Sequence, residues 1–396
     1  MVEEKDDYKG TSLAQSMAAK IQLGMRNTAG KLSNKMRYID KIAPKLVGGG
    51  MVRTCHKINQ LTINATGIAT GHRTIDSFGG ILYGAAAVRQ DVFIEEGSIY
   101  KTRQESVVDV DEIDYLDTSQ RLKYYDILNA YTLLEELMEE KDKPELVMID
   151  VPLLLERGDV PLDNRYSTSK DFIKCKNRIK SFWNEYKNEI YPFNPRGMKL
   201  VTVGSKRFGA VLLAVADNKL DCIIDEIDNE VVSLLQNEKN EIRKIGIQRM
   251  LKGILSPLKR TAAFQFDGLS PRNRLEPKTV REHGLVGYHF KAGLRTKHLL
   301  IETLGSKYEW DSSMIDNLTS EIISLMTYDQ RGTLPLPLWY AKYGLKPLRK
   351  KPGILEFYKR QTQQLLKDEK LEKQWLEGED IFDDVSTPEV KNEGGA

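Results

Sequence analysis

Residues Glu145–Leu155, ELVMIDVPLLL, form a nearly continuous apolar run with one acid, Asp150, in its middle. Such a run is typical of a strand buried on both faces, as strands of a parallel sheet are. A charged carboxylate is costly to bury unless it is paired or bound to a metal. We therefore expect Asp150 at the C-terminal end of this strand. It would be a divalent-cation ligand, a general base or a cap of the following turn.

The residues before this run alternate with the period of strands and then of a helix. We expect a first strand at Gln60–Ala69, the hairpin loop GHRTIDSFGG, a second strand at Gly80–Asp91, a third near Ser106–Val110 and a helix at Thr118–Glu140. Three strands, a crossover helix and a parallel fourth strand is the order of a ribonuclease-H-like sheet. The predicted fold class is therefore α/β, a mixed sheet flanked by helices, with extra helices at both ends.

Further elements are predicted after residue 164 from the same periodicities. They are a helix at Thr168–Ile190, a strand at Lys199–Val203, a strand or turn at Val211–Val215, a helix at Asp228–Leu255, a loop at 257–284, a strand pair at Leu285–Phe290 and His298–Leu304, and a helix at Ser312–Met326.

The two ends of the chain differ from its middle in composition. We divide it into an N-terminal helical extension (1–50), a main domain (51–350), a C-terminal helix (351–376) and an acidic, disordered tail (377–396). The amphipathic N-terminal helix would dock on the core or on a partner. A helix lying on a membrane surface is the alternative, although large aromatic anchors are missing before Tyr38.

Composition excludes several classes of protein. The 396 residues carry 59 Lys and Arg against 57 Asp and Glu, so nucleic acid would have to bind to local patches. No apolar run is long enough to span a membrane, and the polar N-terminus does not resemble a secretory signal. The 3 cysteines are far apart and odd in number, which favours reduced thiols and a cytoplasmic protein.

Common catalytic motifs are absent from the sequence. It contains no Walker phosphate loop, no GxSxG, no GxGxxG behind a strand and no HExxH. The neighbours Cys55 and His56 have no companions at zinc-ligand spacing, so zinc is not expected. The acids of the 118–140 helix, among them Asp126, Glu135 and Glu136, either complete a site with Asp150 or are solvated surface.

Several short motifs, in order, resemble those of the NurA family of nucleases. They are Asn64-Ala65-Thr66-Gly67-Ile68 with GGILYGAAAV at 79–88, Met148-Ile149-Asp150-Val151-Pro152-Leu153, Val203-Gly204-Ser205-Lys206-Arg207, Gly287-Tyr288-His289-Phe290 with Ile301-Glu302, and Pro335-Leu336-Pro337-Leu338-Trp339-Tyr340-Ala341-Lys342. The resemblance covers about residues 58–345. It implies a ribonuclease-H-like core, a homodimer, and a HerA-type hexameric ATPase as partner in DNA end processing.

The resemblance also implies a metal-dependent site that holds Mn²⁺ or Mg²⁺. Asp150 matches the family's second-strand acid, and the helix acid falls on Asp126 or Glu135. The first-strand metal ligand falls on Thr66, and a late histidine falls on Lys342. A hydroxyl is a poor substitute for a carboxylate because hard divalent cations prefer anionic oxygens. We therefore expect metal binding and catalysis to be weakened or lost, unless Asp76 reaches the site from its loop.

DNA, as single strands or duplex ends, is the expected ligand of the basic segments. Lys206, Arg207, Arg349 and Lys350 would contact phosphates, although basic loops are also common as plain solvated surface. Trp339, Tyr340 and Tyr343 would either stack on bases or pack in the core.

Three functions remain open from the sequence. The first is a nuclease that works with a HerA-type ATPase in DNA end resection, repair or phage defence. The second is a non-catalytic subunit that docks on such a motor. The third is a structural adaptor, with no role in nucleic-acid binding, that assembles through its terminal helices.

Overall fold

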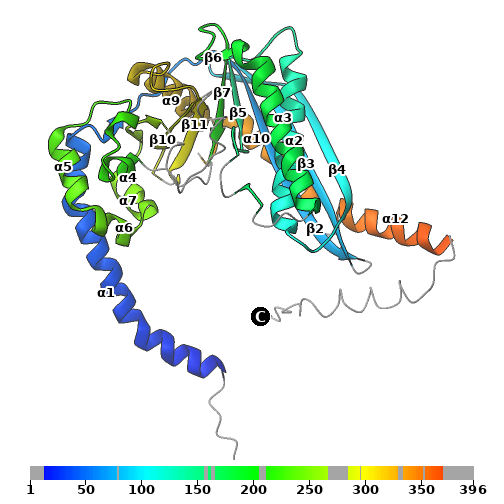
Figure 1. Ribbon diagram of the computed structural model, residues 1–396, viewed down its shortest axis with the longest axis horizontal. Coiled ribbons are helices and arrows are strands. Elements are labelled where there is room, and N and C mark those ends of the chain that lie inside the picture. The colour runs from blue at the N-terminus through cyan, green and yellow to red at the C-terminus, as the bar shows by residue number, and fades with distance from the viewer. Residues whose placement is uncertain are drawn as a thin grey trace, which may run out of the picture.

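One mixed sheet organises the protein (Figure 1). The computed structural model describes residues 13–77, 80–155, 159–161, 166–204, 211–265, 284–294, 296–328, 333–350 and 353–368. Within these ranges the sheet has 11 strands, and its main path runs β1-β8-β10-β11-β7-β5-β2-β3-β4. The strands are β1 (Val52–Thr54), β2 (Ile63–Ser77), β3 (Gly80–Glu95), β4 (Ser98–Ile113), β5 (Leu146–Ile149), β6 (Ile190–Tyr191), β7 (Met198–Val203), β8 (Lys259–Thr261), β9 (Phe264–Gln265), β10 (Leu285–Lys291) and β11 (Leu299–Leu304).

The centre of the sheet has the predicted ribonuclease-H-like order. Strands β2, β3 and β4 form an antiparallel meander. Strand β5 pairs in parallel with β2 on one side and with β7 on the other. All four residues of β5 are buried, as expected for a central parallel strand. The predicted fold class and the parallel position of the Asp150 strand are therefore confirmed.

The hairpin between β2 and β3 is much longer than the sequence predicts. Residues 71–77, expected in a loop, continue β2 and pair with β3 as far as Ser77 opposite Gly80. The third strand also extends well beyond Ser106–Val110, since β4 begins at Ser98. The loop prediction relied on glycine, aspartate and serine, which are turn formers in isolation but are tolerated in a strand with continuous partners.

Helices cover both faces of the central strands. On one face, α2 (Thr118–Met138) and α3 (Tyr166–Tyr186) pack over β2, β5 and β7, as the view in Figure 1 makes visible. On the other face lie α9 (Ser312–Thr327), α10 (Leu336–Gly344) and α11 (Lys346–Arg349). The last described helix, α12 (Ile354–Asp368), lies beside the far part of the β2–β3 hairpin.

A separate cluster of helices surrounds the base of the N-terminal helix α1 (Leu13–Gly48). Residues near the end of α1, such as Ile39 and Leu46, are buried among α4 (Val211–Ala216), α5 (Asn229–Asn237), α6 (Lys239–Ile245) and α7 (Ile247–Ile254). The start of α1 projects away from the sheet (Figure 1). None of the described helices is both long and apolar enough to cross a membrane.

Several predicted elements differ from the observed ones. Val211–Val215 is helical, because its apolar residues pack around the base of α1. The predicted 228–255 helix is broken into three, and Gly246, at φ 90°, separates the last two. Part of the predicted 257–284 loop forms β8 and β9. Lys206, Arg207 and the acidic tail lie outside the described residues.

Candidate functional site

Asp150 lies just beyond the C-terminal end of β5. Its backbone N–H donates to the carbonyl of Ile68, 3.3 Å away, which continues the pairing with β2. Its carboxylate Oδ1 accepts hydrogen bonds from the backbone N–H of Thr70 at 2.9 Å and from the Thr70 hydroxyl at 3.0 Å. The side chain is only 11% exposed. The carboxylate is therefore held against the neighbouring strand, at the sheet edge where the sequence predicts it.

Lys342 of α10 approaches the other oxygen of this carboxylate. Its Nζ lies 3.4 Å from Asp150 Oδ2. Burial raises the pKa of Asp150, whereas the Lys342 ammonium and the Thr70 hydrogen bonds act in the opposite direction. Asp126 adds a smaller upward effect on this pKa, so the two acids are close enough to interact.

Gly67 explains how α10 comes so near to the sheet. A side chain at this position of β2 would place its Cβ 2.3 Å from the carbonyl carbon of Pro337 and from the backbone nitrogen of Leu338. The first turn of α10 therefore rests directly on the backbone of β2. One turn later, the same helix presents Lys342 to the end of β5.

A second carboxylate completes the polar cluster from the opposite helix layer. Asp126 of α2 is hydrogen-bonded through Oδ2 to His72 Nδ1 at 2.7 Å. Its other oxygen, Oδ1, is buried and has no hydrogen-bond partner in the part of the chain that the structure describes. Burial raises the pKa of Asp126, and the bond to Asp126 raises the pKa of His72. The positive charge of Arg349 lowers the pKa of both groups.

Two predicted site residues lie elsewhere. The Thr66 hydroxyl donates to Asp91 Oδ1 at 2.6 Å, and Asp91 is bound in turn by Arg89. Glu135 forms an ion pair with Arg178 of α3. It follows Asp126 by nine residues, which in a helix turns a side chain about 180° away. The sequence left Asp126 and Glu135 as alternatives, and only Asp126 lies near Asp150. Asp76, expected in a loop, pairs with Ile81 within the hairpin.

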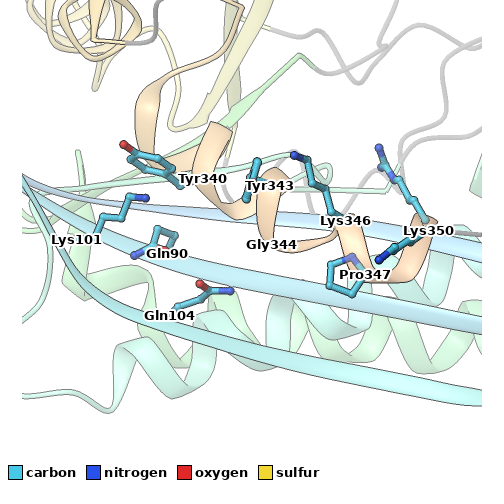
Figure 2. Close-up of a pocket in the computed structure, with 10 residues that line it drawn as sticks. Gln90, Lys101, Gln104, Tyr340, Tyr343, Gly344, Lys346, Pro347 and Lys350 are labelled. Atoms are coloured by element: carbon cyan, nitrogen blue, oxygen red, sulfur yellow. The ribbon is translucent and has the colours of Figure 1, made fainter. Parts of the chain in front are cut away.

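A groove lies beside this cluster, between α10–α11 and the strands β3 and β4 (Figure 2). Its volume is about 920 Å³. The described residues that line it include four cations and two tyrosines but no acid: Gln90, Lys101, Gln104, Tyr340, Tyr343, Gly344, Lys346, Pro347, Arg349 and Lys350. Lys101 Nζ lies 3.6 Å from the Tyr340 ring centroid, and Lys346 Nζ lies 3.6 Å from that of Tyr343. Figure 2 shows Tyr340, Tyr343, Lys346 and Lys350 on the helical side of the groove and Gln90, Lys101 and Gln104 on the strand side.

The aromatic residues of α10, Trp339, Tyr340 and Tyr343, contact one another and are partly exposed to solvent. Trp339 contacts Tyr340 edge to face at a centroid distance of 5.1 Å and lies 5.7 Å from Tyr343. Tyr343 is 53% exposed. Of the two predictions for these residues, core packing does not describe Tyr343, whose ring faces the groove.

The donor set does not fit a divalent cation. Among the described residues, no group of three or more His, Cys, Asp and Glu side chains is arranged to hold a metal. The Oδ1 atom of Asp150 already accepts two hydrogen bonds, and an ammonium group lies beside Oδ2. The Mn²⁺ or Mg²⁺ site that the family resemblance implies therefore lacks its ligands here.

His72, Thr70 and Lys101 belong to the site but were missed in the sequence. His72 falls in the stretch predicted as a loop, where no strand neighbour could be assigned to it, and Thr70 lies between that loop and the predicted strand Gln60–Ala69. Lys101 lies in the part of β4 that the sequence did not predict. The alternation Thr66, Ile68, Thr70, His72 was the available signal, since it places the four residues on one face of a continuing strand.

The strand order and the site together define the class of this protein. It has a ribonuclease-H-like fold, with the carboxylates of Asp150 and Asp126 close to the C-terminal end of β5. No protein-family model matches the chain, and no curated protein matches it. It is similar to the NurA nuclease from Sulfolobus solfataricus (10% identity, TM-score 0.45, covering 85% of this chain and 92% of that one). It is also similar to a structure of NurA with manganese (8% identity, TM-score 0.38, covering 82% of this chain and 94% of that one). A third similar structure is endonuclease V from Bacillus subtilis (11% identity, TM-score 0.32, covering 81% of this chain and 92% of that one). NurA nucleases, whose motifs the sequence resembles, are thus among the solved structures similar to this chain.

Proposed function

We propose that this protein is a NurA-like DNA-processing component that binds DNA in the groove and in which metal-dependent cleavage is weakened or lost. The observation that carries the proposal is the acid-free groove beside Asp150, lined by four cations and two tyrosines. In keeping with its motifs, it would act in the cytoplasm as a homodimer with a HerA-type hexameric ATPase in end resection, repair or phage defence.

The lining of the groove suits single-stranded DNA or an unpaired duplex end. Lysine and arginine side chains neutralise phosphates, and exposed aromatic rings stack on bases without regard to sequence. Lys346, Arg349 and Lys350 are exposed and lie along one short helical segment. Tyr343 is on the preceding turn. A strand of DNA in this groove would therefore have its backbone on α11 and its bases towards α10.

The cluster at Asp150 supports the loss of catalysis. Of the predicted catalytic and metal residues, Asp150 and Asp126 lie near each other and Lys342 contacts the first. Thr66 and Glu135 are held by other partners. Because the Lys342 ammonium lies beside Asp150, the two carboxylates do not offer a free anionic site to a hard cation. Loss of one key group commonly costs about 3 kcal/mol of transition-state stabilisation, a factor of about 100 in rate.

A structural adaptor is the second candidate, and one specific observation favours it. Large apolar side chains of α1 are exposed on the part of the helix that projects from the body (Figure 1): Leu13, Met17, Ile21, Met25 and Met36 are 78%, 53%, 55%, 57% and 64% exposed. Such a stripe is typical of a helix that binds a partner. This role is compatible with docking on a motor and does not require DNA.

DNA binding by charge-reversed variants tests the proposal. Fluorescence anisotropy with a single-stranded oligonucleotide and with a blunt duplex would compare the wild type with Lys346→Glu/Lys350→Glu. We expect the double variant to bind at least tenfold more weakly and to show a shallower dependence of affinity on salt. Lys252→Glu, an exposed change on α7 away from the groove, is the matched control. Unchanged binding by the double variant would leave the adaptor as the better function.

A nuclease assay and a pull-down complete the test. With Mn²⁺ or Mg²⁺ present, we expect no cleavage above that of an Asp150→Asn variant. Robust cleavage that Asp150→Asn abolishes would show that the site is active. Co-purification with a hexameric ATPase of the HerA type, lost on deletion of residues 1–30 but retained in Lys346→Glu/Lys350→Glu, would separate partner docking from DNA binding.

A further inference from the structure

Two carboxylates and two cationic side chains meet at the end of β5. Asp150 contacts Lys342. Asp126 is bonded to His72, two residues beyond the Thr70 that binds Asp150, and Arg349 Nη2 lies 3.3 Å from where a Cβ on the intervening Gly71 would be. The two negative charges are therefore matched by two permanent positive charges that belong to the protein itself. A pocket balanced in this way has little net attraction for a further dication.

The position of Lys342 also competes with a metal in space. A divalent cation binds a carboxylate oxygen at about 2.0–2.6 Å and needs several such oxygens around it. The Lys342 Nζ is 3.4 Å from Asp150 Oδ2, and the opposite oxygen is saturated by Thr70. An ion bound to Asp150 Oδ2 would therefore lie against the ammonium group, and the two like charges would repel.

We propose that the Lys342 ammonium is a built-in cation that takes the place of a divalent metal at Asp150, so that this pocket stays free of metal and DNA binds without one. The claim that DNA binds without a metal rests on the proposed function. The claim that Lys342 takes the place of a metal does not. Removal of the ammonium would uncover Asp150 Oδ2 together with Asp126 Oδ1, which is buried and has no hydrogen-bond partner among the described residues. Loss of Lys342 should therefore create a divalent-cation site where the described part of the chain forms none.

A purely structural role of Lys342 makes a different prediction. Lys342 is 37% exposed and lies on α10, the helix that carries Tyr340 and Tyr343, so a lysine there could serve only to bind phosphate or to stabilise the fold. In that case, substitution would lower DNA affinity or stability but would not confer binding of a metal. Gain of metal binding is thus the measurement that separates the two roles.

Titration of the full-length protein with Mn²⁺, followed by electron paramagnetic resonance of the free ion, tests the proposal. We expect no stoichiometric binding by the wild type and one Mn²⁺ per chain in Lys342→Ala. The variant Lys342→Arg, which keeps the cation, should bind none. Lys342→Ala/Asp150→Asn should lose the new site, and Lys346→Ala, one helical turn further on, should not gain one.

Each outcome decides the matter. One Mn²⁺ bound to the wild type, or none bound to a folded Lys342→Ala, would overturn the proposal. If circular dichroism shows that Lys342→Ala is unfolded, Lys342→Met is titrated instead, because it keeps the length of the side chain without its charge.

Wild-type protein should bind DNA in EDTA, and addition of Mn²⁺ should not increase its affinity. Failure of the wild type to bind DNA would reject the proposed function and leave the metal titration valid.

Discussion

Gly67 of β2 lies directly beneath Pro337 of α10, with no space for a side chain between them. We expect Gly67→Ala to push α10 away from the sheet, because the added methyl group would meet backbone atoms that cannot rotate aside. Overpacking of this kind costs about 1–3 kcal/mol in the free energy of unfolding. Urea denaturation of the variant measures this loss.

Gly30→Ala is the control for this substitution. Gly30 lies in α1, where a new Cβ would meet no atom within 4 Å. Alanine in a helix is favoured over glycine by up to about 1 kcal/mol. The control should thus be neutral or slightly stabilising. Equal stabilities of the two variants would show that α10 is not seated on β2 as described.

Asp225 compensates the fully buried guanidinium of Arg260. Its carboxylate accepts from Arg260 Nη1 at 2.7 Å and from the backbone of Ala263 at 2.6 Å. Removal of one partner of a buried pair leaves a charge without compensation, so Asp225→Ala should lower the free energy of unfolding by about 3–5 kcal/mol. Disruption of the exposed Glu241–Lys244 pair by Glu241→Ala should change it by less than about 0.5 kcal/mol. A small effect at Asp225 would mean that Asp316, which also binds Arg260, compensates the charge alone.

His289 makes stability depend on pH in one direction. Burial lowers the pKa of His289 to about 3, with a further contribution from the nearby His298. An unfolded histidine binds a proton below about pH 6.5. Between that pH and about 3, the unfolded state holds the extra proton, so the free energy of unfolding falls as pH falls. Through His289, the free energy of unfolding changes by at most about 1.4 kcal/mol per pH unit. Above about pH 6.5 this residue does not make the free energy of unfolding depend on pH.

A comparison of unfolding slopes between pH 6.5 and pH 4.5 isolates this residue. His289→Phe retains a ring of similar size but cannot titrate, so its slope should be smaller than that of the wild type. The pKa of His298 is also lowered by burial, and its contribution remains in both proteins. Identical slopes would contradict a neutral, buried His289.

Arg73 joins the far part of β2 to the last described helix. Its guanidinium donates to the carbonyl of Lys350 at 2.8 Å and to Glu356 of α12. Burial acts to raise the pKa of Glu356, but the Arg73 guanidinium outweighs it and holds this pKa below its ordinary value. Arg73→Ala should therefore cost about 1–2 kcal/mol and expose α12 to limited proteolysis. Arg243→Ala, which breaks a pair that is half in solvent, should leave the digestion pattern unchanged.

The sequence predicts the centre of this fold well because its strongest pattern lies there. The apolar run around Met148 has no explanation other than burial on both faces, and one acid at its end fixes the edge of the sheet. Register is harder to obtain. Thr66 is opposite Val147, three positions before Asp150, so its side chain cannot reach the carboxylate that Thr70 binds. The motif alone does not show the register between β2 and β5. That register determines that the hydroxyl of Thr70, and not that of Thr66, binds Asp150.

The groove could not be predicted because it combines distant segments. Gln90 and Lys101 come from the meander, whereas Tyr343 and Lys346 follow it by more than 200 positions. The packing of α10 on Gly67 of β2, and of Gly344 against Val88 and Gln104, brings them together. The sequence predicts phosphate contacts for Arg349 and Lys350, but local sequence does not show which strands form the opposite wall of the groove.

The composite lining of the groove has a consequence for biosynthesis. A chain that has left the ribosome only as far as β4 possesses Gln90, Lys101 and Gln104, yet the opposite wall arrives with the last tenth or so of the chain. Nascent or prematurely terminated products would consequently fold much of the sheet without acquiring the groove. If the groove binds DNA as we propose, only chains whose synthesis has passed Lys350 would do so.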